Sequence, residues 1–196
     1  ITLDRATAGV GINTTFGNFT STSGSRLLTV NAGPDVTSGE AVLSFSGTWS
    51  NSPTATTFDI GANAAVAMTG NLPGGAQTIS VIKNGAGRLQ LSGGYGTWDG
   101  GAAIALNAGT LDLRSIPGDA GVFRNIAAAA GSTLLLTRDT SLDFRSGLTA
   151  AGSMNLATNR ATAGAGGTTT LGTLTLNGTP TISVSAGPAV TSGTAN

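Results

Sequence analysis

The sequence contains neither cysteine nor histidine, and it has a single lysine and a single glutamate. Without these side chains it can form no disulfide, no thiolate or imidazole metal site, no cysteine nucleophile and no Ser-His-Asp triad. Only 9% of its 196 residues are charged, and nine basic residues balance nine acidic ones. The net charge of zero argues against nucleic acid and anionic membrane surfaces as partners, because both attract a basic face.

Long apolar runs and strong helix formers are also scarce. No stretch approaches the roughly 18 consecutive apolar residues of a membrane span, and the four alanines 127–130 are too few to nucleate a helix. A hydrophobic content of 39% with no net charge is not typical of a disordered chain. Gly, Thr, Ser and Asn together supply 93 residues, almost half of the sequence. This composition predicts an ordered, all-β protein.

A repeated segment divides the chain. Residues 5–20 (RATAGVGINTTFGNFT) and 160–175 (RATAGAGGTTTLGTLT) are identical at ten of sixteen positions, at an offset of 155. Residues 31–39 (NAGPDVTSG) and 185–193 (SAGPAVTSG) are identical at seven of nine, at an offset of 154. Two colinear matches with one small gap indicate a tandem duplication.

Short alternating apolar runs follow one another along the whole chain, each bounded by Gly, Asn, Ser or Pro. Alternation with period two predicts half-buried strands. The runs are 28–30, 43–45, 58–60, 66–68, 79–81, 89–91, 104–106, 111–113, 134–136, 142–144, 174–176 and 182–184.

Two all-β architectures fit this pattern. Asn-Gly pairs at 84–85 and 177–178 each lie between alternating runs, a hairpin signal that predicts an array of antiparallel β-sandwiches. Small and β-branched apolar residues, evenly sparse charge and recurrent Gly and Asn turns favour a parallel β-helix, or β-solenoid, with about 20–24 residues per coil.

The solenoid prediction also sets the domain organisation. Residues 1–196 form one continuous segment, with one repeat unit at 1–155 and the start of the next at 156–196. Roughly seven coils would fill each unit, which would then be about 34 Å long at about 4.8 Å per coil. Because the sequence starts at Ile1 without a signal peptide, we expect it to be an internal or processed piece. Because it holds one complete repeat unit and only the start of the next, we expect it to be a window from a longer array.

Residues 83–93 read KNGAGRLQLSG and resemble the autotransporter-associated β-strand repeat of bacterial surface proteins, K-x-G-x-G-x-L-x-L-x-G. The resemblance continues through the following aromatic and an A-G-T-L segment, and covers about 30 residues. It implies a right-handed parallel β-helix displayed outside a Gram-negative-type bacterium, with structural rather than catalytic motif residues. These residues are Lys83, Gly85, Gly87, Leu89, Leu91, Gly93, Trp98, Gly109 and Leu111.

Acidic residues are the first group of candidate functional side chains. Asp112 and Asp143 begin two copies of D-x-R-S, and with Asp139 they could form the carboxylate cluster of a polysaccharide-cleaving β-helix if they converge in a groove. The alternative is that each aspartate pairs with the arginine two residues later on the outside of a strand. Asp119, in a Pro-Gly-Asp-Ala-Gly stretch, is expected to be a turn residue rather than a calcium ligand.

Aromatic residues are the second group. Trp49, Tyr95 and Trp98 could stack on sugar rings, or they could cover the solenoid interior. We expect the interior role, and we expect no cofactor, no metal site and no enzymatic activity.

Together these features predict a non-catalytic structural segment of a long, repetitive, secreted surface protein, which forms a fibre, stalk or sheath by stacking of β-coils. The expected partners are further repeats of the same chain or neighbouring fibres. The alternative function is an adhesin or carbohydrate-binding module, whose partners would be extracellular glycans.

Overall fold

The structure is a computed structural model, and it describes residues 1–21, 24–51, 55–71, 80–93, 103–114, 125–144 and 146–193. Within these ranges the chain forms 24 strands and no helix, and every strand pair is parallel. The predicted parallel β-solenoid is confirmed, and the antiparallel sandwich is wrong.

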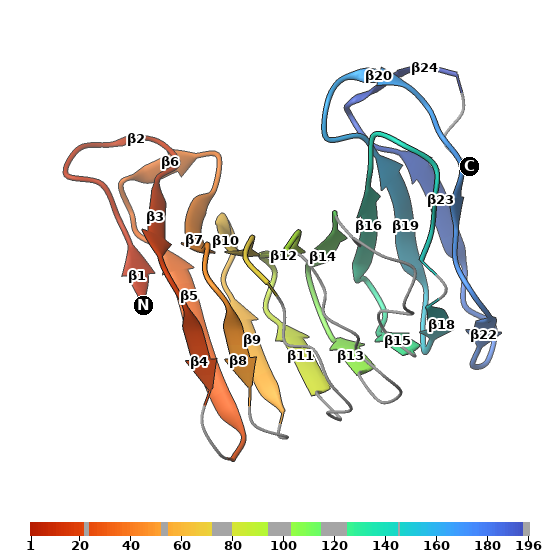
Figure 1. Ribbon diagram of the computed structural model, residues 1–196, viewed down its shortest axis with the longest axis horizontal. Helices are drawn as coiled ribbons and strands as arrows, with labels where there is room; N and C mark the ends of the chain where they lie inside the picture. The colour runs from red at the N-terminus through yellow and green to blue at the C-terminus, as the bar shows by residue number, and fades with distance from the viewer. Residues whose placement is uncertain are drawn as a thin grey trace.

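Two eight-stranded sheets run along the solenoid axis, which is horizontal in Figure 1. Sheet I contains β1 (Thr2–Leu3), β5 (Arg26–Ala32), β9 (Thr56–Ile60), β11 (Ser80–Asn84), β13 (Ala103–Leu106), β15 (Asn125–Ala128), β18 (Gly147–Ala150) and β22 (Leu174–Leu176). Sheet II contains β3 (Asn13–Phe16), β7 (Ala41–Phe45), β10 (Ala64–Met68), β12 (Arg88–Leu91), β14 (Thr110–Leu113), β16 (Thr133–Thr137), β19 (Met154–Asn159) and β23 (Ile182–Ala186).

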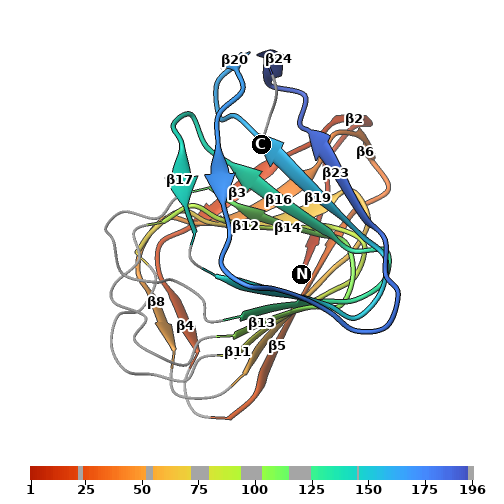
Figure 2. The same ribbon diagram turned by 90° about the vertical axis from the view of Figure 1, so that its right-hand side faces the viewer.

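Shorter pairs complete the end coils. A third side, at the left in Figure 2, carries β4 and β8 near the N-terminus and β17 near the C-terminus. Two further pairs form lobes that project from the coil at its corners, one at each end of the molecule (Figure 1). The third-side pairs are β4 (Phe19–Ser21) with β8 (Trp49–Asn51) and β17 (Leu142–Asp143) with β21 (Thr169–Thr170); the lobes are β2 (Gly9–Val10) with β6 (Val36–Ser38) and β20 (Gly164–Ala165) with β24 (Val190–Ser192).

Coil length changes along the axis. In the middle, Leu89 pairs with Leu111, 22 residues later, whereas at the ends Val30 pairs with Ile60 after 30 residues and Leu156 with Val184 after 28. Seven successive strands of sheet I, from β1 to β18, mark six coils, and the residues 155 positions after β1 lie in β19 of sheet II. One repeat unit is therefore six coils and one further side, about 30 Å long. The prediction of seven coils is wrong, because the repeated segments form longer coils than the middle.

The extra side turns successive repeats relative to each other. The lobe β2/β6 lies where the chain passes from sheet I to sheet II, whereas the lobe β20/β24 lies where it passes from sheet II to the third side. The other repeated strands move in the same direction: β3 of sheet II corresponds to β21 of the third side, β4 to β22 of sheet I, and β5 to β23 of sheet II. Each repeat is thus displaced by one side of the three-sided coil.

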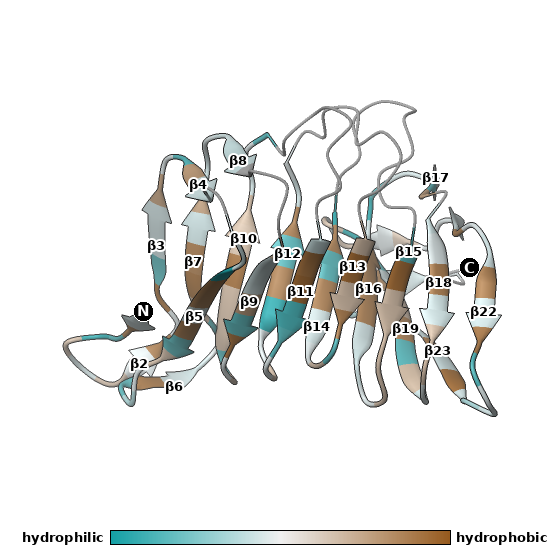
Figure 3. Cartoon of the chain, turned by 90° about the horizontal axis from the view of Figure 1, so that it is seen from below, coloured by the Kyte–Doolittle hydropathy of each residue, from teal (hydrophilic) through white to brown (hydrophobic). Residues whose placement is uncertain are grey.

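Apolar side chains from both long sheets fill the interior in ladders. In sheet II, Leu43, Val66, Leu89, Leu111 and Leu134 stack in register, and each is fully buried. Polar and apolar residues alternate along β12, which is banded in Figure 3, as the period of two requires. The motif residues Leu89, Leu91 and Leu111 are therefore ladder residues.

Glycines form the corners, where successive coils approach too closely for a side chain. A methyl group at Gly70 would overlap the carbonyl oxygen of Gly47, and one at Gly93 would overlap the carbonyl oxygen of Gly70. At the corner between sheet I and sheet II, a methyl group at Gly87 would overlap the carbonyl oxygen of Gly61 in the same way. These columns explain part of the high glycine content of the chain.

The two Asn-Gly pairs are corners and not hairpins. Gly85 and Gly178 have φ of +74° and +80°, in the left-handed region that favours glycine. Each lets the chain leave sheet I and enter sheet II in the same rotational sense, which keeps neighbouring strands parallel.

Candidate functional site

The one lysine of the chain is buried inside a corner. Lys83 is the penultimate residue of β11 and takes its place in an interior ladder between Phe58 of the preceding coil and Leu106 of the following one. Its Nζ donates to the carbonyl oxygens of Asn84 at 2.7 Å, Gly85 at 2.8 Å and Ala108 at 3.2 Å. The aliphatic stem thus continues the ladder, while the ammonium satisfies three carbonyl groups at the turn.

Burial disfavours the charged form of this lysine and lowers the pKa of Lys83 to about 8, although the nearby charge of Asp59 opposes the shift. The side chain has no exposed surface. A buried amine in this position serves as a structural clamp between two coils, because all three ammonium protons have backbone acceptors.

A network of charged side chains covers the outer face of sheet II. Arg88 donates through Nε to Glu40 at 3.1 Å and pairs with the same carboxylate through its terminal nitrogen. It also donates to Asp112 at 3.2 Å, and Arg114 donates to Asp112 at 2.7 Å. Thr137 adds a hydrogen bond to the other oxygen of Asp112 at 2.8 Å. Two cations and two anions therefore form a neutral network that joins β12, β14 and β16 to the start of β7.

Asp112 is fully buried in this network, and Arg88 is largely buried. Burial alone would lower the pKa of Arg88, but hydrogen bonds and charge from Glu40, with Asp112 adding to both, raise it above its ordinary value. The arrangement holds these charges as ion pairs, and the carboxylate of Asp112 is occupied by three donors. This geometry favours a stabilising role over proton transfer.

Sequence reasoning found one half of this network. Asp112 and Arg114 were predicted to pair, and they do; Arg145, the arginine of the other predicted pair, lies outside the described residues. The contact between Glu40 and Arg88 was missed because it crosses β10, where Ala65, in register with Arg88, is fully buried. The small side chain of Ala65, which leaves Arg88 room to reach past β10, is the signal that could have found this contact.

The three aspartates proposed as a carboxylate cluster lie in different parts of the coil. Asp112 is in sheet II, Asp143 is in β17 on the third side, and Asp139 lies between β16 and β17. Asp139 accepts hydrogen bonds from the backbone nitrogens of Ala161 and Thr162 at 3.0 and 2.9 Å. These bonds, with Thr162 contributing most, lower the pKa of Asp139. Among the described residues no group of three or more potential metal ligands comes together.

The aromatic candidates fall into two sets. Trp49 is buried, with 1% of its surface exposed, and it packs edge-on against Phe19 and Phe58 at ring distances of 5.8 and 5.7 Å. Its ring is part of the core and is not presented to a sugar. Tyr95 and Trp98 lie outside the described residues, as does Asp119.

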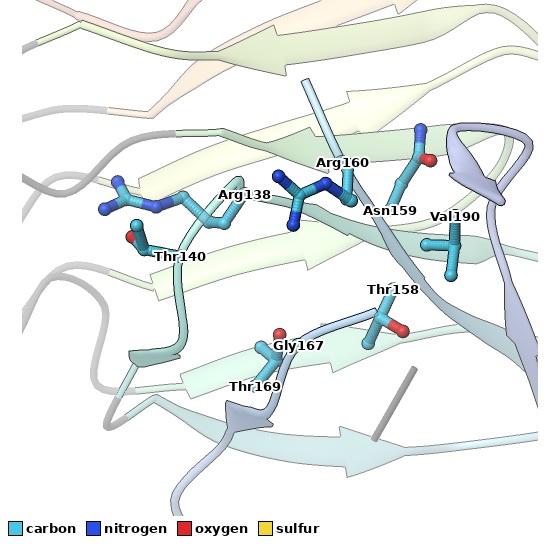
Figure 4. A pocket seen from close by; sticks show the side chains of 8 residues that line it. All are labelled: Arg138, Thr140, Thr158, Asn159, Arg160, Gly167, Thr169 and Val190. Carbon is cyan, nitrogen blue, oxygen red and sulfur yellow. The ribbon is translucent and has the colours of Figure 1, made fainter. Parts of the chain in front are cut away.

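One small pocket lies beside the C-terminal lobe. Figure 4 shows the side chains of Arg138 and Arg160 extending next to each other above Thr169. Arg160 is already held by the carbonyl oxygens of Thr162 and Ala165. The pocket has room for about 10 Å³, close to the lower limit for one water molecule. It is too small for an organic ligand.

The fold and these contacts define the class of the protein as a parallel β-solenoid whose polar clusters hold its coils together. Comparisons with protein families, with curated proteins and with solved structures find no match to this chain. None of the described segments forms a helix that could cross a membrane.

Proposed function

We propose that this chain is a non-catalytic structural segment of a long repetitive surface protein, in which stacked β-coils build a fibre, stalk or sheath. One observation carries the proposal: the repeated segment has the same local structure in both copies. The lobes β2/β6 and β20/β24 share even the register irregularity after Gly9 and after Gly164. A unit that can be added again without a change in local structure suits an extended array.

The polar clusters support the same proposal. Lys83 and the Arg88 network join neighbouring coils through hydrogen bonds between groups of the chain itself. The resemblance of residues 83–93 to autotransporter-associated repeats supports a place on the surface of a Gram-negative-type bacterium. The glycan-binding alternative is less well supported, because Trp49 is in the core.

Imaging the natural full-length protein by electron cryo-microscopy tests this function. We expect filaments with an axial reflection near about 4.8 Å and a repeat near about 30 Å, the length of one unit. Because each unit is displaced by one of three sides, lobes on the same side should recur every three units, about 90 Å. Short isolated particles without these periods would contradict the structural role.

A further inference from the structure

The C-terminal end of the solenoid is open and apolar. β22 and β23 are the last strands of the two long sheets, and no described strand pairs with their outer edges. Between them lies a hollow of about 240 Å³. Side chains that line it include Leu136, Leu148, Leu156, Leu171, Leu174 and Val184.

The first copy of the repeat shows what this surface contacts when it is covered. Val30 and Val184 are equivalent residues, yet Val30 is 0% exposed and Val184 is 65% exposed. Val30 is covered by β9, whose Ile60 is its partner in register. Leu174 is the equivalent of Phe19. Phe19 packs against the next coil, whereas Leu174 is 53% exposed.

Three strands provide the cover in the first copy. β7 pairs with β3, β8 with β4, and β9 with β5. Because β3, β4 and β5 correspond to β21, β22 and β23, the second copy presents the same three edges one side further around the coil.

We propose that the C-terminal end accepts the segment containing β7, β8 and β9 from a second copy of the repeat unit, added as parallel strands on β21, β22 and β23. The inference deepens the proposed function, on which it rests, by naming the segment that joins one unit to the next.

The side chains of this segment match the hollow. In the first copy, Phe45, Trp49 and Phe58 from the covering strands pack on Phe19 at ring distances of 5.0, 5.8 and 5.9 Å. In the second copy, leucine at position 174 replaces that phenylalanine. A smaller side chain at the floor leaves space for the aromatic rings that the incoming segment carries.

A synthetic peptide of residues 40–60, carrying a fluorescent label, tests the inference against the full 196-residue chain. We expect saturable binding by fluorescence anisotropy, because the peptide adds backbone hydrogen bonds and aromatic side chains to an open edge. Val184→Asp should weaken the binding at least tenfold. Leu27→Asp is the matched control, because Leu27 is also 65% exposed but lies in β5, near the N-terminal end of the solenoid.

The controls separate this inference from its alternatives. Circular dichroism should show that both variants keep the fold, since both positions are exposed. A peptide with Trp49 and Phe58 replaced by alanine should bind more weakly than the natural sequence.

No saturable binding, or equal loss with Leu27→Asp, would overturn the inference. Association of whole chains that is sensitive to Val184→Asp, without peptide binding, would also overturn it and would indicate end-to-end stacking instead. Filaments with the expected periods would still support the structural function if peptide binding failed.

Discussion

The two copies of the repeated segment have the same local structure in different surroundings. Arg5 and Arg160 each donate to the carbonyl oxygens two and five residues further along the chain, at 3.2 and 2.9 Å in the first copy and 3.0 and 2.8 Å in the second. Yet Val30 is buried where Val184 is exposed. Local contacts follow from the sequence of the segment, whereas burial depends on the coil that comes next.

This contrast teaches where the stability of the molecule lies. In a solenoid each coil packs mainly against its neighbours, so the same residue contributes a full packing interaction in the interior and little at an open end. Paired substitutions, one at a covered site and one at an open site, test this directly.

The glycine column should give the largest contrast. Gly70→Ala would push a methyl group into the carbonyl oxygen of Gly47, and because that oxygen belongs to the backbone of the preceding coil, the coils would have to separate. We expect a loss of about 5 kcal/mol or more, in the range of exceptional single substitutions. Gly17→Ala has open space around it and should change stability by less than about 0.5 kcal/mol. Urea unfolding measures both, and a neutral Gly70→Ala would contradict the close approach of the coils.

The Arg88 network should give the next largest effect. Arg88→Met removes a cation from the buried carboxylate of Asp112 and should cost about 3 kcal/mol, as for other broken buried pairs. Arg26→Met is the control, since Arg26 is exposed and its side-chain hydrogen bond joins the adjacent residue. The free energy of unfolding should hardly change in the control. If Arg88→Met and Arg26→Met lowered the free energy of unfolding equally, Arg88 would stabilise the fold no more than an ordinary surface arginine does.

Lys83 predicts a pH dependence with a defined sign. Its pKa is about 8 in the folded chain and 10.5 when unperturbed, so between these values the unfolded chain binds a proton that the folded chain lacks. Stability should therefore rise with pH through this window, by up to about 3 kcal/mol. Thermal unfolding measured from pH 7.5 to 10.5 should show the rise in the natural chain. The rise should be absent in Lys83→Met, and its persistence there would assign it to another group.

The equivalent valines Val30 and Val184 should differ less in their effect on the free energy of unfolding, and this difference tests whether the C-terminal end is uncovered. Val30→Ala should cost about 2 kcal/mol, because it leaves a cavity under β9, whereas Val184→Ala should cost less than about 0.5 kcal/mol. Adding the peptide of residues 40–60 should make the second substitution more costly. If both valines cost the same in the free chain, the C-terminal end is covered in solution.

Much of the fold could be predicted from period-two runs, because inward residues of a narrow coil must be apolar. The run at 89–91 lies within β12, and the run at 134–136 lies within β16. Strands without such a run were missed, including β15, where two of its four residues are alanines from the stretch judged unable to form a helix. Its alanines become strand residues because β13 and β18 pair on both sides of them.

The sites were harder to predict, because their contacts join residues of different coils. Asp112 lies in β14 and Arg114 follows directly after that strand, only two residues further on, so their pairing was visible in the sequence. The pairing of Arg88 with Glu40 spans 48 residues, and it depends on coil lengths of 22 to 30 that no local pattern reveals. The contact of Asp139 with the second copy was missed for the same reason.

That contact provides the smallest and most local prediction. Asp139 reaches from the preceding coil to the second copy, where its carboxylate accepts bonds from Ala161 and Thr162 and lies 3.6 Å from Arg160. Asp139→Ala should speed amide hydrogen exchange at positions 161 and 162 about tenfold, while the counterparts at 6 and 7 stay unchanged.

Because the pKa of Asp139 is lowered, its contribution is complete above the ordinary value of 3.8 and is lost as pH falls through the folded value. Acid should therefore make these two amides of the natural chain behave like those of the variant, after correction for intrinsic exchange. A variant whose exchange rates match the natural chain at neutral pH would show that the local sequence alone holds the second copy in place.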